Sequence, residues 1–96
     1  MLVLVCYDVS TVTVSGRQRL RKVAKACEAY GLRVQNSVFE CHLDSARLRV
    51  LKNKLESIID VTNDSLRFYN LGEKYEHKVT HIGTKSIPDL TDVLIL

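Results

Sequence analysis

The sequence predicts a ferredoxin-like α+β sandwich with the order β-α-β-β-α-β and a C-terminal strand extension. One observation is that runs of β-forming residues alternate with two segments whose apolar residues recur at helical spacing. A second is that the chain has 96 residues, few glycines and one proline, with no repeat or low-complexity stretch. That length has room for one core, so we expect residues 1–96 to form a single domain.

The first element expected is a strand over Leu2–Val9, which is apolar at nearly every position and typical of a strand buried on both faces. In a ferredoxin-like sandwich both helices cover one face of the sheet, so the second apolar face needs another cover. We favour a second copy of the chain in a face-to-face homodimer over the chain's own C-terminal region. The alternating side chains are Leu2, Leu4 and Cys6 on one face and Val3, Val5 and Tyr7 on the other.

The middle of the chain predicts a helix and then one or two strands. Ser10–Gly16 is expected to be a loop, and Ser15 with Gln18 forms a capping-box pattern. The helix is therefore expected from about Arg17 to Tyr30. The Val- and Phe-containing stretch Arg33–Leu43 is interpreted as two short strands or one sharply bent strand.

The second half of the chain predicts another helix, a strand and an extension. Asp44 is expected to cap the helix. Leu66–Leu71 predicts a strand, and within the C-terminal extension, residues 78–96, Val79–Ile82 predicts a further short one. The apolar tail Val93–Leu96 is expected to dock along a sheet edge of the partner protomer. The expected inner face of the second helix consists of Leu48, Leu51, Leu55 and Ile58.

Composition narrows the class of protein. Hydrophobic residues make up 46% of the chain and charged residues 26%, as in an ordinary globular domain. The apolar run Leu2–Tyr7 is too short to span a bilayer and lacks signal-peptide flanks, so we expect a cytoplasmic protein with no membrane partner. Three cysteines, an odd number without a Cys-x-x-Cys pair, are expected to be structural free thiols: Cys6, Cys27 and Cys41.

Positive charge is concentrated in one half of the sequence. Residues 17–54 hold ten Lys or Arg against three acids, which is +7, and the remainder holds four against eight, which is −4. Such an asymmetry favours binding to a polyanion, and a solvated basic face without a partner is the alternative. Arg17, Arg21 and Lys25 recur every four residues on one helix face, where they could bind successive phosphates, within the basic cluster that also contains Arg19.

Asp8 is the candidate for chemistry. It ends an otherwise apolar strand on the face of Leu2, Leu4 and Cys6, where an ionised carboxylate is costly unless it is paired or bound to a metal. Two copies across a two-fold axis could hold Mg²⁺, which could activate a water against a phosphodiester. The alternative is a turn-forming hydrogen bond from the loop at Ser10 or Thr11.

Several motifs resemble the CRISPR-associated protein two family, the smaller of the two core spacer-acquisition proteins. The resemblance covers nearly the whole chain in order, and its most specific segment reads Arg-Val-Gln-x-Ser-Val-Phe-Glu. It implies a homodimer with facing sheets, a Mg²⁺ ion shared by the two copies of Asp8, and a C-terminal strand that docks on the partner. The matching segments are Tyr7–Ser10, Arg19–Lys25, Tyr30–Glu40 and Asp64–Tyr69.

The resemblance also implies site residues. Tyr7, Arg19, Arg33 and Phe39 match positions that the family associates with activity or substrate contact. Phe39 has a simple alternative as a core residue. Together with Arg17, Arg21 and Lys25, these four are our predicted nucleic-acid-binding residues, and Asp8 is the predicted catalytic and metal-binding residue.

The resemblance implies two functions, and a toxin-like ribonuclease of related fold is a third alternative. The first is a metal-dependent endonuclease that is also the DNA-binding subunit of the spacer-integration complex, with the CRISPR integrase subunit (Cas one) as partner. Double-stranded DNA is preferred over single-stranded RNA, because no base-stacking platform is visible and two symmetric basic faces suit a duplex. The second is a non-enzymatic architectural dimer that bridges integrase subunits.

Overall fold

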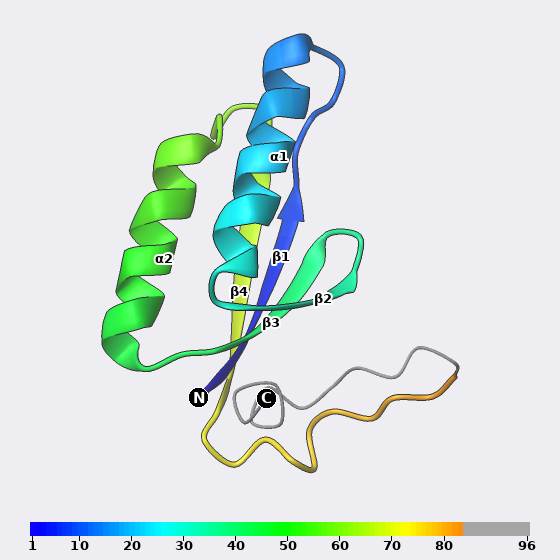
Figure 1. Ribbon diagram of the computed structural model, residues 1–96, viewed down its shortest axis with the longest axis vertical. Coiled ribbons are helices and arrows are strands. Elements are labelled where there is room, and N and C mark those ends of the chain that lie inside the picture. The colour runs from blue at the N-terminus through cyan, green and yellow to red at the C-terminus, as the bar shows by residue number, and fades with distance from the viewer. Residues whose placement is uncertain (84–96) are drawn as a thin grey trace.

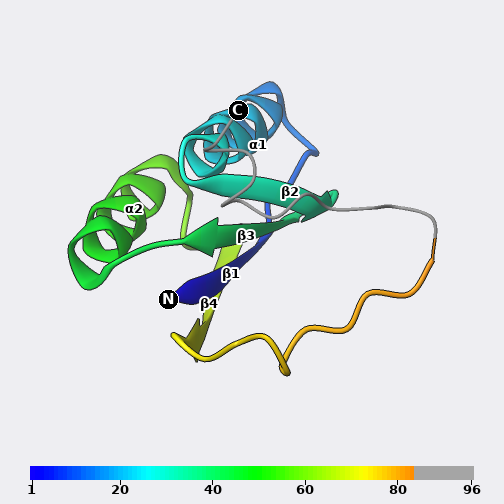
Figure 2. The ribbon, with the colours of Figure 1, turned by 60° about the horizontal axis from the view of Figure 1, so that its bottom comes forward.

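The structure, a computed structural model that describes residues 1–83, has two helices on one face of a four-stranded antiparallel sheet (Figures 1 and 2). The strand order is β2-β3-β1-β4, which places the first strand in the interior of the sheet and the last at an edge. The predicted ferredoxin-like sandwich is therefore confirmed. Its elements are β1 (Leu2–Asp8), α1 (Val14–Glu28), β2 (Gly31–Gln35), β3 (Val38–His42), α2 (Ser45–Ile58) and β4 (Ser65–Gly72).

The core lies between the sheet and the helices. Val3 and Val5 of β1 are fully buried and belong to the same apolar cluster as Leu51 and Leu55 of α2. Asp44 caps α2 as predicted, because its side chain accepts a hydrogen bond from the Arg47 amide at 2.8 Å. Within residues 1–83, neither helix is long and apolar enough to cross a bilayer.

The opposite face of the sheet is apolar along β1, as the sequence predicts. Leu4 and Cys6 remain partly exposed there, whereas Leu2 is only 1% exposed. Near Leu2, the ring of Tyr75 packs edge-on against His42 at 5.1 Å between centroids. The described part of the C-terminal region thus reaches one end of this face and leaves the Cys6 end uncovered by residues 1–83.

Helix α1 begins three residues before the predicted start. The Thr13 side chain, not that of Ser15, caps it by accepting the Gly16 amide at 3.0 Å. Gly16 lies inside the first turn, where the carbonyl oxygen of Ser10 approaches so closely that a Cβ on Gly16 would overlap it. The capping-box prediction was wrong because the loop contacts the helix at a glycine, which sequence spacing does not reveal.

The observed strands decide two further predictions, those for Arg33–Leu43 and for Val79–Ile82. Arg33–Leu43 contains parts of two strands, because β2 and β3 pair as a hairpin with a turn at Asn36 and Ser37. Val79–Ile82 is not a strand, so that prediction was wrong; Ile82 is 90% exposed and does not pack against the core formed by residues 1–83. The tail Val93–Leu96, predicted to dock on a partner, lies outside the described residues.

We expect Gly16→Ala to destabilise the protein, although alanine is normally the better helix former. The added Cβ would meet the Ser10 backbone, and such overpacking costs about 1–3 kcal/mol of unfolding free energy. Urea denaturation measures the effect, with Gln18→Ala at an exposed position of α1 as the control. A Gly16→Ala protein as stable as the control would contradict the close approach.

Candidate active site

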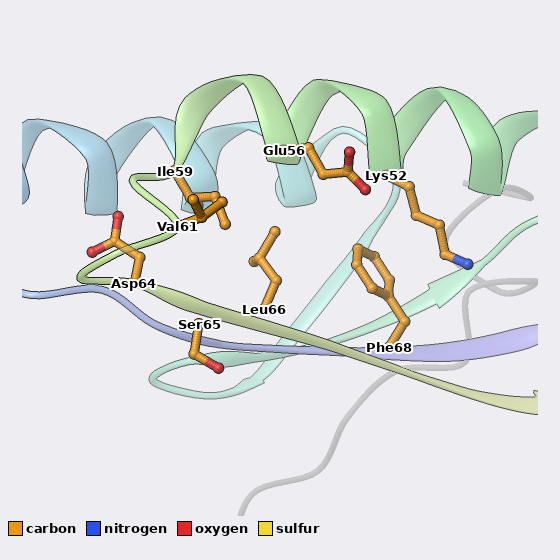
Figure 3. A pocket seen from close by; sticks show the side chains of 8 residues that line it. All are labelled: Lys52, Glu56, Ile59, Val61, Asp64, Ser65, Leu66 and Phe68. Carbon is orange, nitrogen blue, oxygen red and sulfur yellow. The ribbon is translucent and has the colours of Figure 1, made fainter.

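Asp8 is the last residue of β1, and its side chain is exposed at the rim of the sheet. The register pairs it with Ser65, the first residue of β4, so both side chains belong to the helix-free face. Figure 3 shows the alternation along β4: Ser65 points away from α2, whereas Leu66 and Phe68 point toward it. Asp8 therefore lies on the same face as Leu4 and Cys6, as the sequence predicts.

The turn-forming alternative for Asp8 is wrong. The Ser10 amide donates to Asp64 Oδ1 at 3.0 Å instead. On its other side, β1 is held by the β2–β3 turn, since the Tyr7 amide donates to the Ser37 carbonyl at 3.1 Å. The backbone is therefore hydrogen-bonded on both sides of Asp8, at Tyr7 and at Ser10, and the Asp8 carboxylate lies exposed between them at the rim of the sheet.

The site offers one carboxylate per chain. No group of three or more His, Cys, Asp or Glu side chains could hold a metal among residues 1–83. Mg²⁺ prefers oxygen ligands, and proteins often supply only one or two carboxylates while water completes the coordination. One Asp8 carboxylate is a weak ligand set for Mg²⁺, and two Asp8 carboxylates, one from each of two chains, would be a better one.

Asp64, which the sequence analysis did not single out as a site residue, hydrogen-bonds to the loop that follows Asp8 and to the loop that follows α2. Its side chain has no exposed surface and accepts hydrogen bonds from Arg19 Nε at 2.8 Å and from the Asp60 amide at 2.9 Å, in addition to that from Ser10. The Arg19 hydrogen bond is the main reason that the pKa of Asp64 lies below its usual value, with burial acting in the opposite direction. One carboxylate therefore joins the loop after β1, the loop after α2, and helix α1.

Arg19 uses three of its five N–H donors in this network. Its Nη2 donates to Asp64 Oδ1 at 3.4 Å and its Nη1 to Ser15 Oγ at 3.2 Å, so each guanidinium nitrogen has a partner within the chain. The predicted phosphate contact at Arg19 would have to compete with a buried ion pair.

The other predicted basic residues are accessible. Arg17, Arg21 and Lys25 are exposed on α1, and Arg17 also donates to the Thr11 carbonyl at 3.1 Å. Arg33 is exposed on β2 with its guanidinium 5.2 Å from the centre of the Phe39 ring. These four side chains can meet an anion without unfolding the domain.

The two predicted aromatic contacts are buried on the helix side of the sheet. Phe39 has no exposed surface and Tyr7 is 5% exposed, and their rings stack at 6.2 Å between centroids. The Tyr7 hydroxyl donates to the Asn36 carbonyl at 3.3 Å, and burial raises its pKa. Direct contact of either ring with nucleic acid has no support in this conformation, and burial favours the core interpretation of Phe39.

The cysteines are free thiols, as expected. Burial raises the pKa of Cys27 to about 11 and that of Cys41 to about 12, so both stay protonated at neutral pH. Both thiols are also fully buried, which fits the structural role predicted for them.

Fold and site together define a class: a small ferredoxin-like domain with an exposed carboxylate ending its first strand and basic side chains on its first helix. The chain belongs to the family described as CRISPR associated protein Cas2, whose model matches residues 1–79. The resemblance stated from the motifs is thereby confirmed.

Individual relatives agree with this assignment. The chain is 60% identical over 95 residues to the CRISPR-associated endonuclease Cas2 of Halalkalibacterium halodurans, covering 99% of each chain. It is 56% identical over 95 residues to the CRISPR-associated endoribonuclease Cas2 3 of Rhodospirillum rubrum, covering 99% of this chain and 100% of that one.

Solved structures match the fold as well. Streptococcus pyogenes Cas2, crystallised at pH 6.5, superposes with a TM-score of 0.76 at 53% identity, covering 86% of this chain and 100% of that one. A chain of a partial Cas6-RT-Cas1–Cas2 complex superposes with a TM-score of 0.62 at 34% identity, covering 84% of this chain and 88% of that one.

We expect Asp64→Ala to lower the free energy of unfolding by about 2 kcal/mol, because the Ser10 and Asp60 amides lose their buried acceptor. Arg19→Ala should destabilise in the same direction. The double variant should be little worse than Asp64→Ala alone, since both changes remove one network. Chemical denaturation of the four proteins gives the coupling; strictly additive losses would show that the two side chains act independently.

Proposed function

We propose that this chain is a CRISPR adaptation protein that works as a homodimer and hydrolyses phosphodiester bonds through Asp8. The observation that carries the proposal is the position of Asp8: an exposed carboxylate at the rim of a sheet face that is apolar along β1 and not covered by the helices. The names of the relatives, endonuclease and endoribonuclease, support the same class of reaction.

The dimer follows from the helix-free face. Leu4 and Cys6 are partly exposed there, beside Val38 and Glu40 of β3. Facing this surface with a second copy would remove the apolar side chains from water and give an isologous, two-fold interface. A two-fold axis that passes beside the end of β1 would place the two copies of Asp8 next to each other.

The two Asp8 carboxylates would hold Mg²⁺. The ion, when bound, supplies an activated water and neutralises charge that develops on the phosphate oxygens. The role of this chain is to fix the two carboxylates at the rim and to leave space there for the phosphodiester. Ser65, opposite Asp8 in the register, adds a hydroxyl at the same rim that can donate to a phosphate oxygen.

For the substrate we propose double-stranded DNA ahead of single-stranded RNA. Exposed Arg17, Arg21 and Lys25 follow one face of α1, and the dimer would present this face twice, which suits the regular phosphates of a duplex. The buried rings of Tyr7 and Phe39 provide no base-stacking surface, which single-stranded RNA recognition generally uses. The complex that contains Cas1 and Cas2 supports a CRISPR integrase subunit as partner.

One observation favours a second function, an architectural dimer that holds DNA for the integrase without cutting it. Residues 1–83 supply a single rim carboxylate per chain and no group of three metal-ligating side chains. The exposed basic face of α1 would serve that role unchanged. The two functions differ in what they require of Asp8.

We expect Asp8→Ala to reduce Mg²⁺-dependent cleavage by about 100-fold or more while leaving DNA affinity unchanged, because the carboxylate is needed for the ion and not for the basic face. Cleavage of duplex DNA and of RNA is measured with purified protein in Mg²⁺ or EDTA. Equal cleavage by wild type and Asp8→Ala, or cleavage that survives EDTA, would favour the architectural dimer.

Binding should depend steeply on salt. If a dimer contacts about six phosphates, its affinity for duplex DNA falls roughly a thousandfold between 50 and 200 mM salt. Arg21→Ala removes two of these contacts per dimer and should make the slope of log affinity against log salt shallower by about 1.8. Fluorescence anisotropy measures the slope, with Gln18→Ala as the matched control on α1; an Arg21→Ala slope equal to that of wild type would remove this face from the binding site.

A further inference from the structure

We propose that Arg19 and Asp64 are a positioning pair for Asp8: they fix the loop that follows β1, and the Arg19 guanidinium acts on Asp64 and not on a phosphate. This inference rests on the proposed function of Asp8. It assigns a role to Asp64, and it changes the role expected for Arg19 from binding to positioning.

The first support is the attachment of the loop directly after Asp8. Val9 is buried, and the next residue, Ser10, donates its amide to Asp64 Oδ1 at 3.0 Å. The backbone of Asp8 is therefore held on one side by its β4 register with Ser65 and on the other by the Ser10–Asp64 hydrogen bond. Loss of the Asp64 acceptor would release the chain two residues beyond the carboxylate.

The second support is the direction of the Arg19 side chain. Only 18% of its surface is exposed, and its Nε and Nη2 both point at the Asp64 carboxylate while its Nη1 donates to Ser15 Oγ. Arg21, two residues further on, is exposed, and residues 1–83 provide it with no such carboxylate. A planar fork of donors suits a carboxylate that must stay in one orientation, and a lysine ammonium cannot replace it.

The third support is the packing of the loop against α1. The Ser10 carbonyl contacts Gly16 from one direction while the Ser10 amide is bound to Asp64 from the other. The Gly16 contact lies in the first turn of α1, the helix that also supplies Arg19, whereas the Asp64 contact lies at the loop before β4. The loop thus has backbone constraints on both sides of Ser10, and the Arg19–Asp64 pair connects them to the loop before β4.

The test uses the full-length protein and Mn²⁺ as the metal probe, detected by electron paramagnetic resonance. We expect Arg19→Ala, Asp64→Ala and the double variant each to weaken Mn²⁺ affinity about tenfold, and Arg19→Lys to do so as well, because it keeps the charge but loses the fork. The salt slope of DNA affinity should stay as in wild type for both Arg19 variants. Leu48→Ala, in the first turn of α2 at the opposite end of the helix from the Asp64 loop (Figure 1), controls for general destabilisation and should retain Mn²⁺ affinity.

Each opposite outcome has a distinct meaning. A salt slope that becomes shallower by about 1.8 in Arg19→Ala and recovers in Arg19→Lys, with Mn²⁺ affinity unchanged, would make Arg19 a phosphate contact and overturn the inference. If Leu48→Ala also binds Mn²⁺ more weakly, general destabilisation would explain the loss of affinity in the Arg19 and Asp64 variants, and the inference would be overturned. Asp8→Ala is measured in parallel: if it binds Mn²⁺ as tightly as wild type, the proposed function itself fails.

Discussion

The carboxylate of Asp64 is the interaction on which the arrangement of this end of the molecule depends. It accepts hydrogen bonds from the loop after β1, from the loop after α2, and from Arg19 of α1. A buried carboxylate is costly unless charge and hydrogen bonds compensate it, and here both do. Because the three segments are fixed relative to one another, the end of β1 has one position, and Asp8 is presented at the rim of the sheet without a partner of its own in the described chain.

The second constraint is the composition of β1. Its Val3, Val5 and Tyr7 side chains fill the core beneath the helices, while Leu4 and Cys6 on the other face remain partly exposed. An exposed apolar face on such a strand is typical of a surface that another molecule covers. The same strand therefore fills the core with one face and carries Asp8 on the other. The face that carries Asp8 is also the apolar face that a partner would cover.

Local patterns in the sequence predicted most of the fold and the exposed positions of Asp8 and of the basic residues on α1. The β1 alternation, the Asp44 cap and the exposed basic face of α1 depend on neighbouring residues, which sequence periodicity records. The Arg19–Asp64 pair joins residues 45 apart, and no periodicity reveals it. The start of α1 was missed for a similar reason, because it depends on a tertiary contact at Gly16, and Val79–Ile82 was mistaken for a strand because β-forming residues alone do not provide a neighbouring strand.

The most direct test of a metal site shared between two chains is the stoichiometry of Mn²⁺ binding, measured together with the oligomeric state by sedimentation velocity. Wild-type protein should sediment as a dimer and bind one Mn²⁺ per two chains, and Leu4→Asp, which places a charge on the helix-free face, should sediment as a folded monomer that binds none. One ion per chain, or undiminished binding by the Leu4→Asp monomer, would contradict a site built from two copies of Asp8.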